Sequence, residues 1–223
     1  MFKDGEPANI RAKVRGKLVY DPRLDTSPGA NPDNQTYFAW TANPILCGAD
    51  YMRNYWGSEG FAASRFDWAH IDAQADLADV LVTSPDGNQA RYTCNGALTL
   101  GAGHEENLAR ILQCCLGRRT TSNGLIRLSV GDDLTPDVTI DETDIIGSVV
   151  VRTAVPRSER FNKVVGTFIS EDQIYTEAEF IPVEDAGFVT RDNGETITRP
   201  LALDMGTNEY QAQRLAFKLL QQS

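Results

Sequence analysis

The fold of this chain is decided in residues 10–51, which begin IRAKVRGKLVYDPRL (residues 10–24) and end WTANPILCGADY (residues 40–51). From Ile10 to Tyr20 apolar and basic side chains alternate, and this period of two is typical of a half-buried strand. Pro22 ends the strand, because its ring fixes φ and it has no backbone N–H for a strand ladder. After a loop rich in Pro, Gly, Asp and Asn, Asn43 and Pro44 provide the N-cap and first position of a helix.

Four segments have the apolar spacing of amphipathic helices: residues 43–55, 69–82, 104–116 and 207–222. The third is the clearest, since its apolar side chains recur at every third or fourth position and Gly117 provides a C-terminal stop. Asp67 and Thr207 are the expected N-caps of the second and fourth helices. These helices need a partner surface, most simply a sheet.

Strand-like segments occupy much of the rest of the chain. Residues 118–121 and 125–130 flank Asn123 and Gly124, which provide the positive φ of a tight hairpin. A second hairpin is expected at residues 192–194, and residues 90–100 form a strand bent at Asn95 and Gly96. The last third has further strand-like segments, at residues 147–155, 161–170, 177–183 and 196–204.

The pattern predicts an α+β fold, with a helix-containing layer and an antiparallel β sheet or barrel. Three parts are expected along the chain. They are an N-terminal strand and loop (1–40), an α/β subdomain (41–130) and a β-rich subdomain with a closing C-terminal helix (131–223).

Composition narrows the function classes. The formal net charge of −10 disfavours wrapping of nucleic acid, which needs Lys and Arg to replace phosphate counterions. No apolar run approaches the roughly 20 residues of a membrane-spanning helix. No apolar signal core follows Met1, so synthesis and retention in a cytoplasm are expected.

Metal and cofactor chemistry finds little support. The four cysteines include no C-x-x-C pair and there are only two histidines, which is a poor set for zinc or for a disulfide framework. Gly101 and Gly103 precede a helix, as the glycines of a phosphate-binding loop do, but the Lys of such a loop is not present after them. Two acidic residues stand instead at the start of the helix, where a phosphate would bind. Two groups of acidic residues lack the ligand order of a calcium-binding loop. The first is expected on a solvated helix face and comprises Asp72, Asp76 and Asp79. The second is expected in turns around a strand at 138–140 and comprises Asp132, Asp133, Asp137, Asp141, Glu142 and Asp144. We expect no cofactor, no metal and no catalytic residue.

Two features are candidate contacts with other subunits. One is the basic face of the first strand, which in an acidic protein could pair with residues 132–144 of a neighbour. The other is the aromatic loop 55–61, part of an aromatic-rich region at residues 37–68 that we expect mainly to pack internally. The candidate interface residues are Arg11, Lys13, Arg15, Lys17, Tyr55, Trp56 and Phe61.

Five short stretches, at residues 15–23, 40–51, 91–96, 161–164 and 211–216, resemble in the same order the central hub region of the lambda-type tail-tip proteins (protein J family) of long-tailed phages. The resemblance implies a structural hub subunit that caps the tail tube, assembles as a homotrimer with other tail proteins, and serves tail assembly and host attachment. It implies location at the virion tail tip after synthesis in the bacterial cytoplasm, with DNA present only in transit and a host surface receptor as a further partner.

Two other function classes stay open at this point. A host-glycan binding module would present an exposed aromatic patch. A cell-wall glycosidase would present a cleft with two facing carboxylates, whose separation of roughly 5 to 10 Å the sequence does not give.

Overall fold

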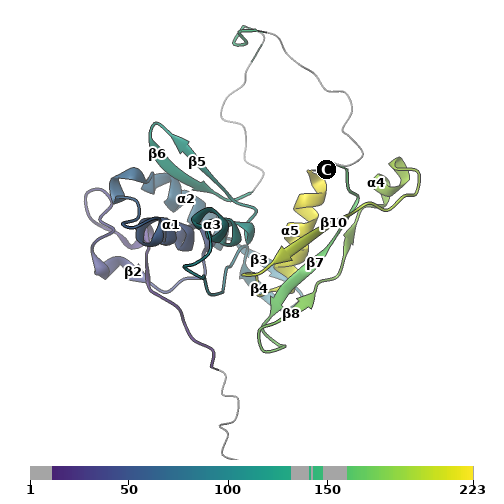
Figure 1. Ribbon diagram of the computed structural model, residues 1–223, viewed down its shortest axis with the longest axis horizontal. Coiled ribbons are helices and arrows are strands. Elements are labelled where there is room, and N and C mark those ends of the chain that lie inside the picture. Colours follow the sequence, from purple (N-terminus) through teal and green to yellow (C-terminus); the bar gives the residue numbers. More distant parts are fainter. Residues whose placement is uncertain (1–11, 132–140, 142, 148–159, 223) are drawn as a thin grey trace, which may run out of the picture.

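The computed structural model describes residues 12–131, 141, 143–147 and 160–222 of the 223. Arg11, the strand expected at 138–140, most of the acidic run and nearly all of the strand expected at 147–155 lie outside the described residues. The described chain forms two lobes side by side (Figure 1), which we call the helical lobe (residues 19–131) and the sheet lobe (residues 160–222).

Three α-helices, three short 3-10 helices and three antiparallel pairs of strands make up the described part of the helical lobe. The α-helices are α1 (Pro44–Tyr55), α2 (Trp68–Asp79) and α3 (His104–Gln113). The strand pairs are β1 (Val19–Tyr20) with β2 (Phe38–Ala39), β3 (Leu81–Ser84) with β4 (Gly87–Ala90), and β5 (Arg118–Ser122) with β6 (Leu125–Ser129). The last two pairs are tight hairpins, whereas a long loop with two 3-10 helices joins β1 to β2. Asn43 caps α1 as predicted, and its side-chain amide also donates to the carbonyl of Ala75 in α2 at 2.9 Å.

A small mixed sheet and two helices make up the sheet lobe. Its elements are β7 (Lys163–Ser170), β8 (Thr176–Glu179), β9 (Val183–Glu184), α4 (Ala186–Arg191), β10 (Thr198–Leu203) and α5 (Glu209–Gln221). The strand order is β10-β7-β8, with β9 also pairing with β7. The strands β8 and β9 run antiparallel to β7, whereas β10 runs parallel to it, and α5 packs against β7. The α+β class is confirmed, and the described strands form no closed barrel.

The first predicted strand is much shorter than its pattern. Only Val19 and Tyr20 pair with another strand, because β2 offers just two residues to pair with. Residues 12–18 carry no regular secondary structure, and every one of them is exposed. The side chain pattern of a half-buried strand is therefore present without the sheet that would bury it.

Two other expected strand features are wrong. Residues 91–100 are not a strand: their backbone N–H groups bond to separate elements, with Tyr92 donating to Ala78 and Cys94 to Ala42. The turn at residues 192–194 closes α4 instead of a hairpin. There the Gly194 N–H donates to the carbonyl of Val189 at 2.9 Å. The sequence did not distinguish the two structures, because a helix C-terminus and a tight hairpin both require residues with positive φ, as Asn193 and Gly194 have.

Candidate interaction surface

The basic side chains of residues 12–18, which we call the basic segment, contact both lobes. Lys13 pairs with Glu171, at the tip of the β7–β8 hairpin in the sheet lobe. Arg15 and Lys17 face the helical lobe, where the Arg15 guanidinium lies 5.1 Å from the ring centre of Trp40. The segment therefore bridges the lobes on the outside of the molecule, and Arg11, the fourth predicted cation, lies outside the described residues.

Lys17 is the best-anchored of these cations. Its ammonium lies 2.9 Å from the carboxylate of Asp50 and 5.0 Å from the ring centre of Tyr55. Burial raises the pKa of Asp50 from its ordinary value, and the hydrogen bond and charge of Lys17 act against this rise. Lys17 thus compensates an acid that is largely removed from water.

The three aromatic candidates belong to one stacked cluster. Tyr55 stacks on Tyr51 at 6.1 Å between ring centres, Tyr51 meets Trp56 edge-on, and Trp56 lies 5.7 Å from Phe61. The structure brings Lys17, from the basic face, next to the aromatic loop, although the sequence indicated these as two separate features. Lys13 and Arg15 lie apart from this cluster.

Sequence reasoning missed His104, which fixes this cluster. Its Nε2 accepts from the Gly57 N–H at 3.2 Å, so in the neutral ring Nδ1 carries the proton and donates to the Tyr51 hydroxyl at 3.2 Å. Asn107, from the same helix, also donates to that hydroxyl. Because His104 lies about fifty residues from its partners, no short motif signals the contact.

The joint between the lobes is built from two of the resembling stretches, 91–96 and 211–216. Gln211 is 1% exposed, and its amide makes four hydrogen bonds. Its oxygen accepts from the N–H and hydroxyl of Thr93, and its nitrogen donates to the carbonyls of Thr93 and Cys114. One side chain of α5 thereby satisfies backbone groups of two separate segments of the helical lobe.

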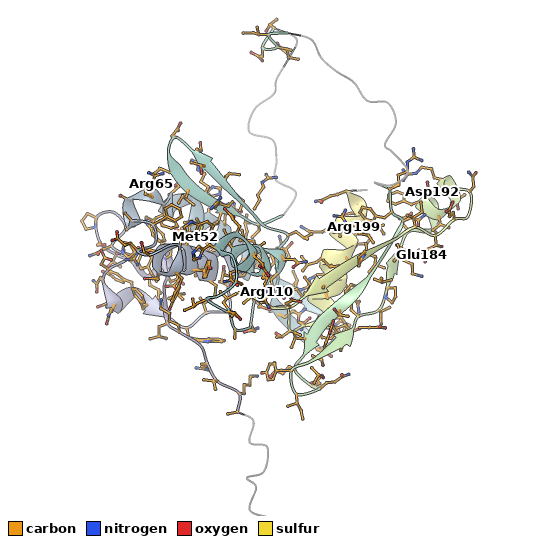
Figure 2. All side chains as sticks on the ribbon, viewed as in Figure 1. Met52, Arg65, Arg110, Glu184, Asp192 and Arg199 are labelled. Carbon is orange, nitrogen blue, oxygen red and sulfur yellow. The ribbon has the colours of Figure 1, made fainter. Side chains whose placement is uncertain are left out.

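The other resembling stretches also make internal contacts. Buried Asn162 donates to Asp192 and to the carbonyl of Glu195, and it accepts from the Ile197 N–H, which fixes the connection between α4 and β10. Figure 2 shows Asp192 at the end of the sheet lobe remote from the helical lobe. Arg23 pairs with Asp21 and with Asp79 of α2, both at 2.8 Å.

The acidic face of α2 therefore has a basic partner that the sequence interpretation did not assign. Arg23 also lies 3.3 Å from Asp76, while Asp72 remains partly exposed. Within the described residues, no three Cys, His, Asp or Glu side chains gather as metal ligands would. Asp141 accepts hydrogen bonds from the N–H and hydroxyl of Thr143, the arrangement of an acidic turn.

Three of the four cysteine side chains, those of Cys94, Cys114 and Cys115, are buried. Burial raises the pKa of Cys115 to about 12 and also raises that of Cys114. A hydrogen bond with Cys47, together with burial, raises the pKa of the Cys94 thiol. Since the thiolate is the nucleophilic form of cysteine, these shifts disfavour the nucleophilic form at the three buried side chains.

No model of a known protein family matches this chain, and no curated protein matches it either. None of the described helices has the length and apolar character needed to cross a bilayer.

Proposed function

We propose that the chain is a segment of the structural hub at the tail tip of a long-tailed phage, where copies assemble, as a ring of three, at the end of the tail tube. The observation that carries this proposal is the arrangement of the five resembling stretches. Two of them, 91–96 and 211–216, interlock through Gln211, and Asn162 and Asn43 from two others are buried and hydrogen-bonded between elements.

This placement favours a scaffold role for the matched residues. The side chains of Asn43, Asn162 and Gln211 hydrogen-bond to groups inside the chain, mostly backbone N–H and carbonyl groups, so these three side chains hold elements together. A hub subunit needs a fixed shape, because neighbouring subunits must meet at the same angle around the ring. The acidic balance fits a channel past which DNA moves without sticking.

Immunogold electron microscopy of phage particles from the source organism tests the proposal. An antibody raised against the 24.6 kDa chain is expected to label particles at the tail end remote from the capsid. Particles that the antibody does not label, or labels only on the capsid, would contradict the proposal. Hydrolysis of purified cell-wall polysaccharide by the chain would instead support the glycosidase alternative.

A further inference from the structure

The outer edge of β8 is an acidic strand edge that no other described strand covers. The strand pairs with β7 on one side only, in a register that sets Ala178 opposite buried Phe168. Ala178 therefore faces the core, and the residues on either side of it, Glu177 and Glu179, share the opposite face, where both are exposed. A free edge of this kind offers a row of unpaired backbone groups to another strand.

The charges on this edge select what can pair with it. Two copies of β8 placed side by side would bring like charges together, which disfavours pairing between two such edges. A strand with basic side chains two residues apart on one face would instead place opposite charges across the ladder. Pairing of the β8 edge with β8 of a second copy is thus disfavoured, whereas pairing with a basic strand is favoured.

The chain itself contains a segment with this pattern of side chains, at residues 12–18. Lys13 and Arg15 flank Val14 as Glu177 and Glu179 flank Ala178, so the two patterns match in either strand direction. Val14 is 80% exposed and Leu18 is 54% exposed, although their alternation is that of a half-buried strand. The segment runs directly into β1, which already has strand geometry.

The segment does not lie along β8 of its own chain. Lys13 touches Glu171 at the hairpin tip, but Arg15 lies over Trp40 and Lys17 is held at Asp50, both in the helical lobe. Figure 1 shows the segment leaving the helical lobe and passing the tip of the β7–β8 hairpin without following the strand. The Lys13–Glu171 pair is exposed on both sides and holds the segment weakly.

We propose that residues 12–18 of one copy add as a strand to the outer edge of β8 of a second copy, with Lys13 and Arg15 facing Glu177 and Glu179 and with Val14 covering Ala178. Charge complementarity identifies the occupant. Residues 11–17 hold four cations, which leaves 17 of the 21 Lys and Arg residues against 31 Asp and Glu residues elsewhere in the chain. The donor strand and the acceptor edge are different surfaces, so the contact is head-to-tail and closes a ring when the rotation allows. This inference rests on the proposed function, because it names the contact by which the hub assembles.

Charge reversal on each surface tests the contact by sedimentation velocity of the full chain over a range of concentrations. K13E with R15E, and separately E177K with E179K, are each expected to raise the dissociation constant for assembly by about tenfold or more, because each puts like charges across the ladder. The variant with all four substitutions keeps the wild-type net charge and restores opposite charges. It is expected to assemble within about threefold of wild type.

A matched control reverses two exposed cations on the helical lobe, Arg65 and Arg118. Figure 2 shows Arg65 on the outer side of that lobe. The variant R65E with R118E has the same net charge as K13E with R15E and is expected to assemble as wild type. Circular dichroism establishes that each variant is folded.

Three outcomes would overturn the inference: a wild-type chain that stays single at every concentration, assembly that neither paired reversal weakens, or a four-substitution variant that remains dissociated. If assembly does not depend on these charges, the proposed strand contact is wrong but the proposed tail-tip location is not affected. Immunogold labelling tests that location independently.

Discussion

Gln211 shows how much of this structure depends on single buried polar side chains. Its amide spans from α5 to Thr93 and Cys114, so its loss leaves one N–H, one hydroxyl and two carbonyls without that partner. A buried polar group left without a hydrogen bond costs about 1 to 3 kcal/mol. The side chain therefore stabilises the joint between the lobes through what it satisfies, more than through its own volume.

Replacing Gln211 with Leu, which has a similar size, is expected to lower the free energy of unfolding by about 2 to 4 kcal/mol. Urea denaturation followed by circular dichroism measures the change. The control is Gln213→Leu on the same helix, whose amide donates to Glu209 one turn away in the described part of the chain. A change below about 0.5 kcal/mol is expected there. Equal losses in the two variants would contradict the role assigned to Gln211.

His70 gives the fold a pH dependence with a defined sign. Its Nε2 lies 2.9 Å from the Ser129 hydroxyl, and burial, followed by the charge of Arg127, lowers the pKa of the imidazole from its ordinary value. The unfolded chain then binds a proton more readily than the folded chain. The stability contributed by the neutral ring is present above about pH 6.5 and is lost as pH falls through the unfolded pKa towards the folded one.

The variant His70→Gln is expected to remove this part of the pH dependence. Free energies of unfolding measured at pH 7.5 and pH 5.5 are expected to differ less in the variant than in wild type. Parallel pH profiles for the two proteins would show that the ring does not titrate differently in the folded and unfolded states.

At the scale of elements, β7 and β10 approach closely because Gly166 has no side chain. A Cβ built at Gly166 would overlap the backbone carbonyl of Leu201 in β10 and crowd the ring of Phe180. Neither neighbour is the end of a flexible chain that can move aside cheaply. The parallel pairing of β10 therefore depends on this glycine.

Gly166→Ala is expected to cost about 3 kcal/mol or more in the free energy of unfolding, because the backbone of β10 has to shift. Thermal and urea denaturation measure the loss. Gly101→Ala, where a methyl group meets open space and φ is ordinary, serves as the control and is expected to be nearly neutral. A stable Gly166→Ala variant would mean that β10 can lie farther from β7 than described.

Local chemistry predicted some elements from the sequence and failed on others for physical reasons. Asn43 with Pro44, and Asn123 with Gly124, specify a helix start and a hairpin by themselves, and both are confirmed. Alternation in residues 10–20 reports which side chains share a face but not whether a pairing strand exists, so it over-extended the first strand. On the candidate surface, the aromatic loop 55–61 is a run of neighbours in sequence, so the sequence indicates it as one feature. The contacts of Lys17 and His104 with this loop join residues far apart in the chain, so no local pattern indicates them.

At the scale of the whole molecule, one continuous core joins the two lobes, from Ile45 and Leu108 on one side to Leu203 and Leu215 on the other. Two parts held together in this way form a body of fixed shape, and the proposed donor segment and acceptor edge lie on different parts of it, as a head-to-tail ring requires.

Native mass spectrometry of the wild-type chain at low ionic strength tests this claim most directly. The account predicts a dominant species of three copies of the 24.6 kDa chain, with dissociation as salt rises because exposed ion pairs are screened. A single chain at every concentration and ionic strength would contradict it.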